Sequence, residues 1–317
     1  MTTVERFDGY ELAEPIGAGG MAEVFRARRL GAREIHRDVC IKRIRREMCC
    51  DAGFSEMFTD EARISMALRH PNIVAVEHFG EHAGTLYMAM EWVHGVNLSE
   101  LHKTVTASGR TIPTWAVCFI LGEVLAGLHY AHAKVDARGQ WLQIVHRDVS
   151  PHNVMVSFAG EVKLADFGIA KATSRLHQTA GAVIKGKVAY LAPEQATSGI
   201  LDGRTDLFAL GVTAYEMLAG CLPHQGPTPT AVLVAALHAQ HRPLHTLRPD
   251  LPAGLARRTP EAVPLLGRNV PGRPPVRTPS SGRGGSAPGT LRRALLHAPG
   301  APVCPGVRRG RGALSVV

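Results

Sequence analysis

Short apolar runs separated by polar or glycine-rich turns fill the first ninety residues and predict strands. Residues 10–28 read as a strand, a glycine-rich turn and a second strand, residues 39–42 as a short strand that ends on Lys42, and residues 85–93 as a longer strand. Residues 54–68 have helical spacing of their apolar side chains and end before a proline. Glu61 lies on the same apolar stripe, so we expect it to point inward.

The second part of the chain has the longer apolar period of helices. Residues 115–133 are rich in Leu, Ala and Val and follow a start signal at Pro113. Residues 202–217 form another convincing helical segment, residues 231–240 a shorter one, and Leu251 resembles the start of a further helix.

Lys42 and Glu61 are charged residues that this pattern places on inward faces. A Lys at the end of a strand commonly extends its ammonium group to solvent. A buried acid, however, needs a cation, and a buried cation needs an acid. We therefore predict that Lys42 pairs with Glu61.

The net charge of +9 belongs to one end of the chain. Residues 256–317 carry eleven Arg and one acid, whereas the other 255 residues carry 25 basic and 26 acidic side chains. The folded part is therefore not expected to bind nucleic acid. A block of like charges such as the arginines of residues 256–317 is usually solvated. With ten Pro and ten Gly, this end cannot bury enough apolar surface to offset its ordering entropy. Three explanations stay open: a disordered tail, a frameshifted reading of a GC-rich gene, and a degenerate end of the helical part.

The six Cys have no metal-type spacing, and Cys49-Cys50 is only a vicinal pair. The sequence indicates no signal peptide and no apolar run near 18 residues. We therefore expect reduced thiols, a cytoplasmic location and no membrane contact. The sequence gives no indication of the oligomeric state.

Two polar loops carry the candidate chemistry. Residues 144–153 read Ile-Val-His-Arg-Asp-Val-Ser-Pro-His-Asn, with Asp148 and Asn153 five residues apart, and we expect this loop to lie between two short strands. Residues 164–168 read Leu-Ala-Asp-Phe-Gly and place Asp166 at the end of another strand. Two acids and an amide on neighbouring loops can hold a divalent metal and leave one carboxylate as a base.

The order and spacing of these two loops resemble the catalytic core of the protein kinases, in the bacterial eukaryotic-type (Hanks-type) serine/threonine branch. The resemblance covers about residues 7–250. It implies the α+β class and a bilobal kinase fold. The expected parts are a small β-rich N-lobe at residues 1–90, a larger helical C-lobe at residues 91–255 whose end looks truncated, and an Arg/Pro/Gly-rich disordered tail at residues 256–317.

The resemblance also implies the reaction, in which the γ-phosphate of ATP passes to serine or threonine hydroxyls of protein substrates. Mg²⁺ is the expected metal, with Mn²⁺ as an option. Asp148 would orient and deprotonate the hydroxyl, while Asn153 and Asp166 would hold the metal. Lys42, fixed by Glu61, would bind the ATP phosphates.

The same resemblance assigns the nucleotide site. Glycine lets a backbone approach phosphates closely, although a lone glycine-rich turn is more often only a hairpin. The turn departs from the family at its third glycine, which is Ala22. Val24 would cover the adenine, Met90 would lie behind it, and the backbone of Glu91 and Val93 would bond its edge. The complete predicted set is Ile16, Gly17, Ala18, Gly19, Gly20, Met21, Ala22, Glu23, Val24, Cys40, Lys42, Met90, Glu91, Val93 and Met155.

Residues 171–185 are polar and aperiodic and lie where kinases keep an activation loop. Thr173, Ser174 and Thr179 are the predicted phosphosites, of which Thr179 is favoured. Arg147 would bind the phosphate, because a guanidinium pairs well with a bidentate anion. By resemblance, Asp206 would brace the backbone of the loop that contains Asp148.

Two departures from the family pattern matter. The residue two after the catalytic Asp is usually Lys and is Ser150 here, whereas a Thr usually stands at the position of Lys187. We hypothesise that Lys187 reaches back toward Asp148 and restores the missing charge; the alternative is a weakened enzyme with an unrelated surface cation. The second departure is the end of the chain, where no late Arg in the family's context is recognised to pair with Glu194.

Two other classes of protein stay open. A pseudokinase would serve as a nucleotide-binding or protein-binding module, disabled by Ser150 and the abnormal end. Retention of Lys42, Glu61, Asp148, Asn153 and Asp166 argues against it. A small-molecule phosphotransferase of kinase-like fold would be expected to lack the long activation loop and the Ala-Pro-Glu motif at residues 192–194, and both are present.

Overall fold

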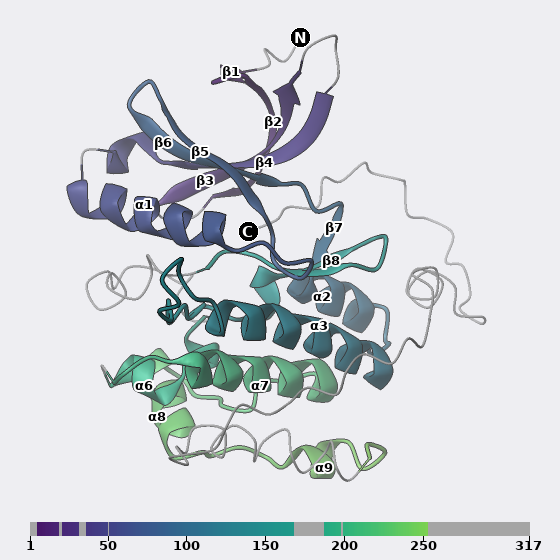
Figure 1. The fold of residues 1–317 in the computed structure, drawn as a ribbon. Coiled ribbons are helices and arrows are strands. Elements are labelled where there is room, and N and C mark those ends of the chain that lie inside the picture. Colours follow the sequence, from purple (N-terminus) through teal and green to yellow (C-terminus); the bar gives the residue numbers. More distant parts are fainter. Residues whose placement is uncertain are drawn as a thin grey trace, which may run out of the picture.

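The fold is a β-rich lobe stacked on a helical lobe (Figure 1). The structure, a computed structural model, describes residues 5–18, 21–31, 36–49, 51–167, 187–197 and 199–252. The N-lobe contains a six-stranded antiparallel sheet in the order β1-β2-β3-β4-β6-β5. Its strands are β1 (Glu5–Phe7), β2 (Tyr10–Ala18), β3 (Ala22–Leu30), β4 (His36–Ile44), β5 (Val76–His82) and β6 (Thr85–Glu91). This arrangement confirms the expected β-rich first part.

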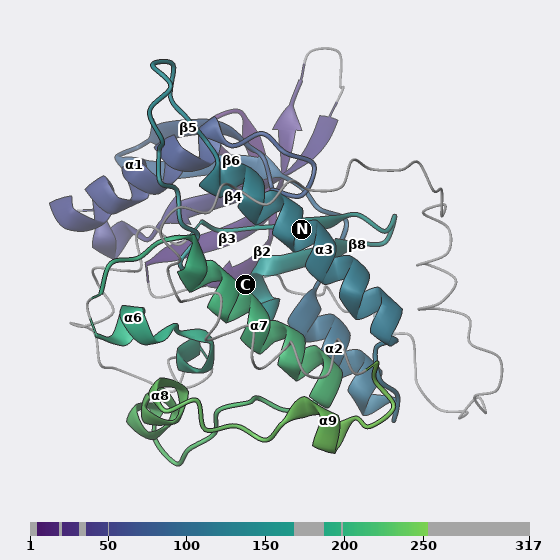
Figure 2. The same cartoon turned by 60° about the horizontal axis from the view of Figure 1, so that its bottom comes forward.

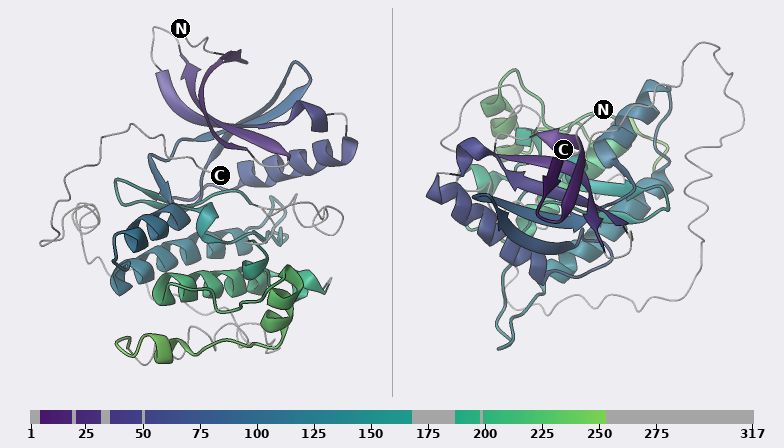
Figure 3. Two further views of the ribbon diagram at one scale, coloured as in Figure 1. Left: turned by 180° about the vertical axis from the view of Figure 1, so that it is seen from behind. Right: turned by 90° about the horizontal axis from the view of Figure 1, so that it is seen from above.

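Helix α1 (Ala52–Ala67) packs beside β5 and β6 (Figure 3). It begins after Asp51, whose side chain accepts hydrogen bonds from Gly53 N and Phe54 N. A short 3-10 turn, η2 (Arg46–Met48), precedes it. Alternation along β4 divides the lobe into two apolar layers. Val39 and Ile41 join the layer around Tyr87, whereas Cys40 joins the layer that contains side chains of α1. The side chain of Lys42 lies on the same face of β4 as that of Cys40, because side chains two residues apart in a strand share one face.

The C-lobe is built on three long helices that lie side by side, α2 (Leu98–Ala107), α3 (Thr114–His132) and α7 (Gly203–Ala219) (Figure 2). Shorter elements are η3 (Pro151–Asn153), η4 (Val188–Tyr190), α6 (Pro193–Ala196), α8 (Pro229–Leu237) and α9 (Leu244–Leu247). The main core packs α3 against α7, and Leu244 and Leu251 close it from the C-terminal side. The predicted helix beginning at Leu251 falls mostly outside the described residues, as does the predicted tail.

Helix α3 corrects one expectation from the sequence. By length and composition alone it is apolar enough to cross a membrane, although no apolar run near 18 residues was expected. Its buried side chains, including Val117, Val124 and Leu128, belong to the main core of the C-lobe. In this fold α3 is therefore a core helix.

A small antiparallel sheet joins the candidate loops to the rest of the C-lobe. Its strands are β7 (Gly95–Asn97), β8 (Val154–Ser157) and β9 (Val162–Leu164). Gly95 begins β7, and a Cβ there would lie 2.1 Å from Val156 O. Ile144 and Val145 are buried but form no strand, because they have no ladder partner among the described residues. The strand predicted before the catalytic loop is therefore wrong.

The segment after α1, at residues 72–74, is hydrogen-bonded to β9 of the C-lobe. We call this connection the β9 stitch. Val74 N donates to Leu164 O, and Leu164 N donates to Asn72 O, each at 2.9 Å. The Asn72 side chain donates to Val162 O and to Glu123 on α3. Leu68 and Ile73 are buried in the main core of the C-lobe. The C-terminal end of α1 is therefore anchored outside its own lobe.

Candidate active site

Lys42 lies between two carboxylates from different parts of the chain. Its Nζ is 2.6 Å from Glu61 Oε1 on α1 and 2.9 Å from Asp166 Oδ1, which follows β9. Burial by itself would lower the pKa of Lys42, but the carboxylates of Asp166 and Glu61 outweigh it and raise that pKa above its ordinary value. The structure thus brings together the pair that the sequence predicted and adds Asp166 to it.

Asp148 and Asn153 are held together inside the catalytic loop, residues 146–153. Asn153 Nδ2 donates to Asp148 O at 2.7 Å and to Asp148 Oδ2 at 3.1 Å. The short helix η3 returns the chain so that these side chains meet, and both residues are buried. An amide that donates through nitrogen presents its oxygen as an acceptor, which is the donor type that hard cations prefer.

Asp206, at the start of α7, supports the backbone of this loop. Its carboxylate is fully buried and accepts hydrogen bonds from His146 N and Arg147 N, both at 2.8 Å. His132 Nε2 lies 2.7 Å from the same carboxylate. Arg147 has a φ of 65°, a left-handed conformation that a non-glycine residue adopts only under tertiary constraint. The brace suggested by the family resemblance is thus present in the geometry.

His146 connects the two candidate loops. Asp148 N donates to its Nδ1, and its Nε2 lies 3.0 Å from Ala165 O, so the bonds require the neutral tautomer with a proton on Nε2. Burial lowers the pKa of His146, in agreement with a neutral ring. The ring centroid lies 4.6 Å from that of Phe167, which is itself buried. Ala165 N also donates to Asn153 O at 2.8 Å, so Asp166 is held close to Asn153.

The side chains expected around adenine come together in the N-lobe. Ile16, Cys40 and Met90 are buried in one apolar cluster, with Val24 packed against it. Met155 is buried in β8. Glu91 N donates to Ala75 O, so a bond from Glu91 to adenine has to come through its carbonyl.

The glycine-rich turn is described only in part. Gly17 pairs with Val24 and Ala18 with Glu23 where β2 meets β3, and Met21 O accepts from Arg45 N. Gly19 and Gly20 lie outside the described residues, as do the predicted phosphosites Thr173, Ser174 and Thr179.

The donor set fits a metal that is shared with a nucleotide. Among the described residues, no three His, Cys, Asp or Glu side chains cluster as a metal site. Asn153 and Asp166 supply one amide and one carboxylate from adjacent loops. Mg²⁺ typically takes one or two such protein oxygens and completes its shell with phosphates and water. These residues therefore suit Mg²⁺ bound together with a polyphosphate.

The comparison with known families shows to which family the chain belongs. A profile described as protein kinase domain matches residues 10–258. The chain belongs to the protein kinase family. The crystal structure of the PknI kinase domain of Mycobacterium tuberculosis superposes with a TM-score of 0.58 at 28% identity, covering 84% of this chain and 99% of that domain. The bilobal fold is thereby confirmed.

Two curated relatives are similar to this kinase but carry different names. It is 42% identical over 252 residues to the tyrosine-protein kinase MasK of Myxococcus xanthus, covering 80% of this chain and 39% of MasK. It is 34% identical over 243 residues to the serine/threonine-protein kinase PrkC of Bacillus subtilis, covering 77% of this chain and 35% of PrkC. The chain thus spans less than half the length of either relative.

Sequence reasoning missed two contacts around the Ala-Pro-Glu motif of the kinase. Gln195 accepts from Ala192 N and donates to Arg147 O at 2.9 Å, which ties α6 to the catalytic loop. Thr205 Oγ1 donates to Glu194 at 2.7 Å. Glu194, for which the sequence offered no late Arg, therefore accepts a hydrogen bond from α7. The partners are distant in sequence, so no local pattern pointed to them.

Cys40, a residue of the predicted nucleotide site, is expected to be chemically inert. Burial, reinforced by Asp166, raises the pKa of its thiol to about 12. At pH 8 about one thiol in 10⁴ is then ionised, against roughly a quarter of ordinary thiols. Alkylation by iodoacetamide should therefore be at least ~100-fold slower at Cys40 than at the exposed Cys118, as followed by peptide mass spectrometry.

Unfolding provides the control for this prediction, because in guanidinium the two thiols should react alike. Labelling of Cys40 within tenfold of Cys118 in the folded kinase would contradict it.

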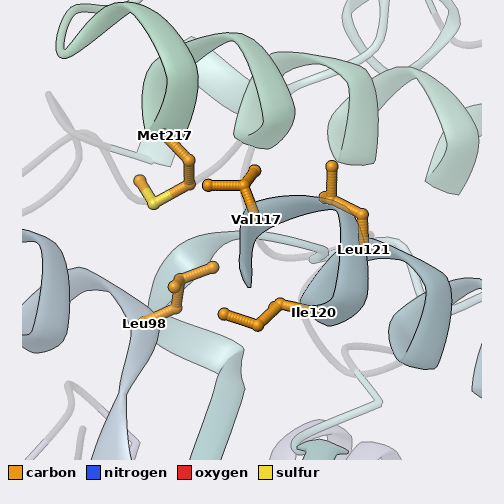
Figure 4. A pocket seen from close by; sticks show the side chains of 5 residues that line it. All are labelled: Leu98, Val117, Ile120, Leu121 and Met217. Carbon is orange, nitrogen blue, oxygen red and sulfur yellow. The ribbon is translucent and has the colours of Figure 1, made fainter. Parts of the chain in front are cut away.

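A small apolar pocket lies away from these residues. It lies between α2, α3 and α7 and is too small to hold a water molecule (Figure 4). The side chains that line it are Leu98, Val117, Ile120, Leu121 and Met217. A ligand site normally includes polar groups that fix orientation, and this pocket has none. It is therefore not a ligand site.

Proposed function

We propose that this kinase uses ATP and Mg²⁺ to phosphorylate serine or threonine hydroxyls of proteins, and that it phosphorylates itself in the segment before residue 187. One observation carries the proposal. Lys42 is held by Glu61 and Asp166, while Asp166 is held beside the loop that carries Asp148 and Asn153. A phosphate-binding cation, metal donors and a carboxylate base are therefore assembled in one place.

The roles of the residues follow from their chemistry. When bound, Mg-ATP supplies the γ-phosphoryl group and a divalent charge. Lys42 binds the ATP phosphates as a fixed cation, and Asn153 and Asp166 hold the metal. Asp148 orients the acceptor hydroxyl and accepts its proton. Ile16, Val24, Cys40 and Met90 exclude water from the adenine.

Self-phosphorylation is supported by the surroundings of Arg147. Its Nε is buried without a hydrogen-bond partner among the described residues. A buried guanidinium nitrogen in this state favours an anion, and a phosphate from a neighbouring segment supplies one. Similarity to PrkC supports serine or threonine as acceptor, whereas similarity to MasK supports tyrosine, so the acceptor must be measured.

A pseudokinase is the second candidate function, and Ser150 favours it. Its hydroxyl is buried without a hydrogen-bond partner among the described residues, and it replaces the usual catalytic-loop Lys. In that case the chain would bind ATP but transfer no phosphate.

The proposed function is tested by incubating the purified chain with Mg-ATP and measuring its intact mass and phosphoamino acids. We expect phosphoserine or phosphothreonine, including Thr173, Ser174 or Thr179, and none in excess EDTA. A parallel Asp148→Asn chain excludes a contaminating kinase. Phosphotyrosine alone would contradict the acceptor class. ATP-induced thermal stabilisation without transfer would favour the pseudokinase.

A further inference from the structure

The carboxylate of Asp148 has a cation beside it that the catalytic loop does not supply. Lys187 Nζ lies 3.7 Å from Asp148 Oδ2. The side chain of Lys187 is one-third exposed, whereas that of Asp148 is 6% exposed. The ammonium group thus stands at the rim of the site, where it can reach a group brought to Asp148 from solvent.

The loop between Asp148 and Asn153 contains no basic residue other than His152. It contains neither Lys nor Arg, the side chains that stay protonated at pH 7. Ser150 is almost completely buried and uncharged. A cation near the transferred phosphoryl group therefore has to come from outside this loop.

Lys187 is positioned by a buried support. It caps η4, whose three residues are all buried. Tyr190, the last of them, donates its hydroxyl to Glu216 on α7 at 2.5 Å. Gln195 ties the following turn to Arg147 O, in the same loop as Asp148. Both members of the Lys187–Asp148 contact are therefore held by α7 and its neighbours, and a site on such elements is placed more accurately than one on a free loop.

We propose that Lys187 is the catalytic cation that neutralises the phosphoryl group in transfer to the hydroxyl at Asp148. The proposal rests on the proposed function. In the step, the acceptor oxygen bonds to the γ-phosphorus, the bond from that phosphorus to the β-γ bridging oxygen breaks, and its electron pair leaves with ADP. The hydroxyl proton goes to Asp148, and Lys187 keeps its protons throughout. Because charge spreads over the equatorial phosphoryl oxygens, a preorganised cation lowers the barrier wherever in the sequence it originates.

The first test is Lys187→Ala. We expect kcat to fall ~100-fold or more, equivalent to about 2.7 kcal/mol, with the KM for ATP changed less than about threefold. Lys134→Ala is the matched control, since Lys134 contacts Tyr130 on α3, and it should leave kcat unchanged. Thermal unfolding with and without Mg-ATP establishes that each variant folds and binds nucleotide.

The second test moves the charge. Lys187→Thr should be as inactive as Lys187→Ala, whereas Lys187→Thr combined with Ser150→Lys should regain at least ~10-fold in kcat. This rescue separates a required cation from a merely structural Lys187, because the support of η4 is unchanged between the two variants. A folded, ATP-binding double variant without any rescue would overturn the proposal.

The wild-type chain must be measured beside these variants. An active wild type with Lys187→Ala within threefold of it contradicts this proposal alone. A wild type that transfers no phosphate contradicts the proposed function, and this proposal with it.

Discussion

An Asp148→Asn variant is expected to bind Mg-ATP as tightly as the wild-type kinase and to transfer phosphate about 10²- to 10⁴-fold more slowly. The substitution keeps the shape of the side chain, and the bond from Asn153 to the backbone carbonyl of residue 148 does not depend on it. The amide cannot accept the hydroxyl proton, so only transfer should suffer. Single-turnover transfer and ATP-induced thermal shift measure the two effects separately.

Asp136→Asn is the matched control, since Asp136 lies in an exposed turn where its Oδ1 accepts from two backbone N–H groups. An amide oxygen can make the same bonds, so transfer and stability should stay at wild-type values. An Asp148→Asn chain within tenfold of the wild-type rate would remove Asp148 from the mechanism.

A Lys42→Met variant should lose both activity and stability. Transfer is expected to fall about 10²- to 10³-fold, because a fixed cation at the phosphates is lost. The change also leaves Glu61, whose side chain is 7% exposed, without its cation. Removing one partner of a buried pair typically costs about 3–5 kcal/mol. For a domain of this size we expect Tm to fall by roughly 6–15 °C, as measured by differential scanning calorimetry.

The double variant Lys42→Met with Glu61→Gln separates these two effects. With the uncompensated carboxylate removed, much of the lost Tm should return, whereas transfer should stay at the level of Lys42→Met. Recovery of activity together with Tm would mean that Lys42 acts only through stability.

The local periodicity of the sequence was enough to predict that Glu61 points inward, because it lies seven residues from each end of an apolar stripe. A buried acid requires a cation, which predicted its pairing with Lys42. The motif spacing placed Asp148, Asn153 and Asp166 on neighbouring loops in the same way. Helix α2 was missed because its polar residues hide its apolar face. Asn97 caps it by accepting from Glu100 N, and an Asn followed three residues later by Glu is a signal that could have revealed it.

The supports of the site could not be predicted from local patterns. Tyr190 and Glu216 are 26 residues apart, and Gln195 and Arg147 are 48 apart. His132 and Asp206 are 74 residues apart. Each bond depends on how α7 packs against distant loops. A polar residue inside an apolar helix, such as Asp206, shows only that some partner exists.

The β9 stitch restricts how the lobes can move. The chain also passes between the lobes from the end of β6 to β7, at residues 91–95. Because these two connections join the N-lobe to the C-lobe, the N-lobe can rotate only about the line through them, which is the rotation axis. Helix α1 meets this rotation axis at its C-terminal end, because Leu68 is buried in the C-lobe core. At a rise of 1.5 Å per residue, Glu61 lies about 10 Å and Ala52 about 24 Å from Leu68 along α1. Any rotation of the N-lobe about this axis therefore displaces Ala52 more than twice as far as Glu61. The contact between Glu61 and Lys42 thus lies in the part of α1 that moves less.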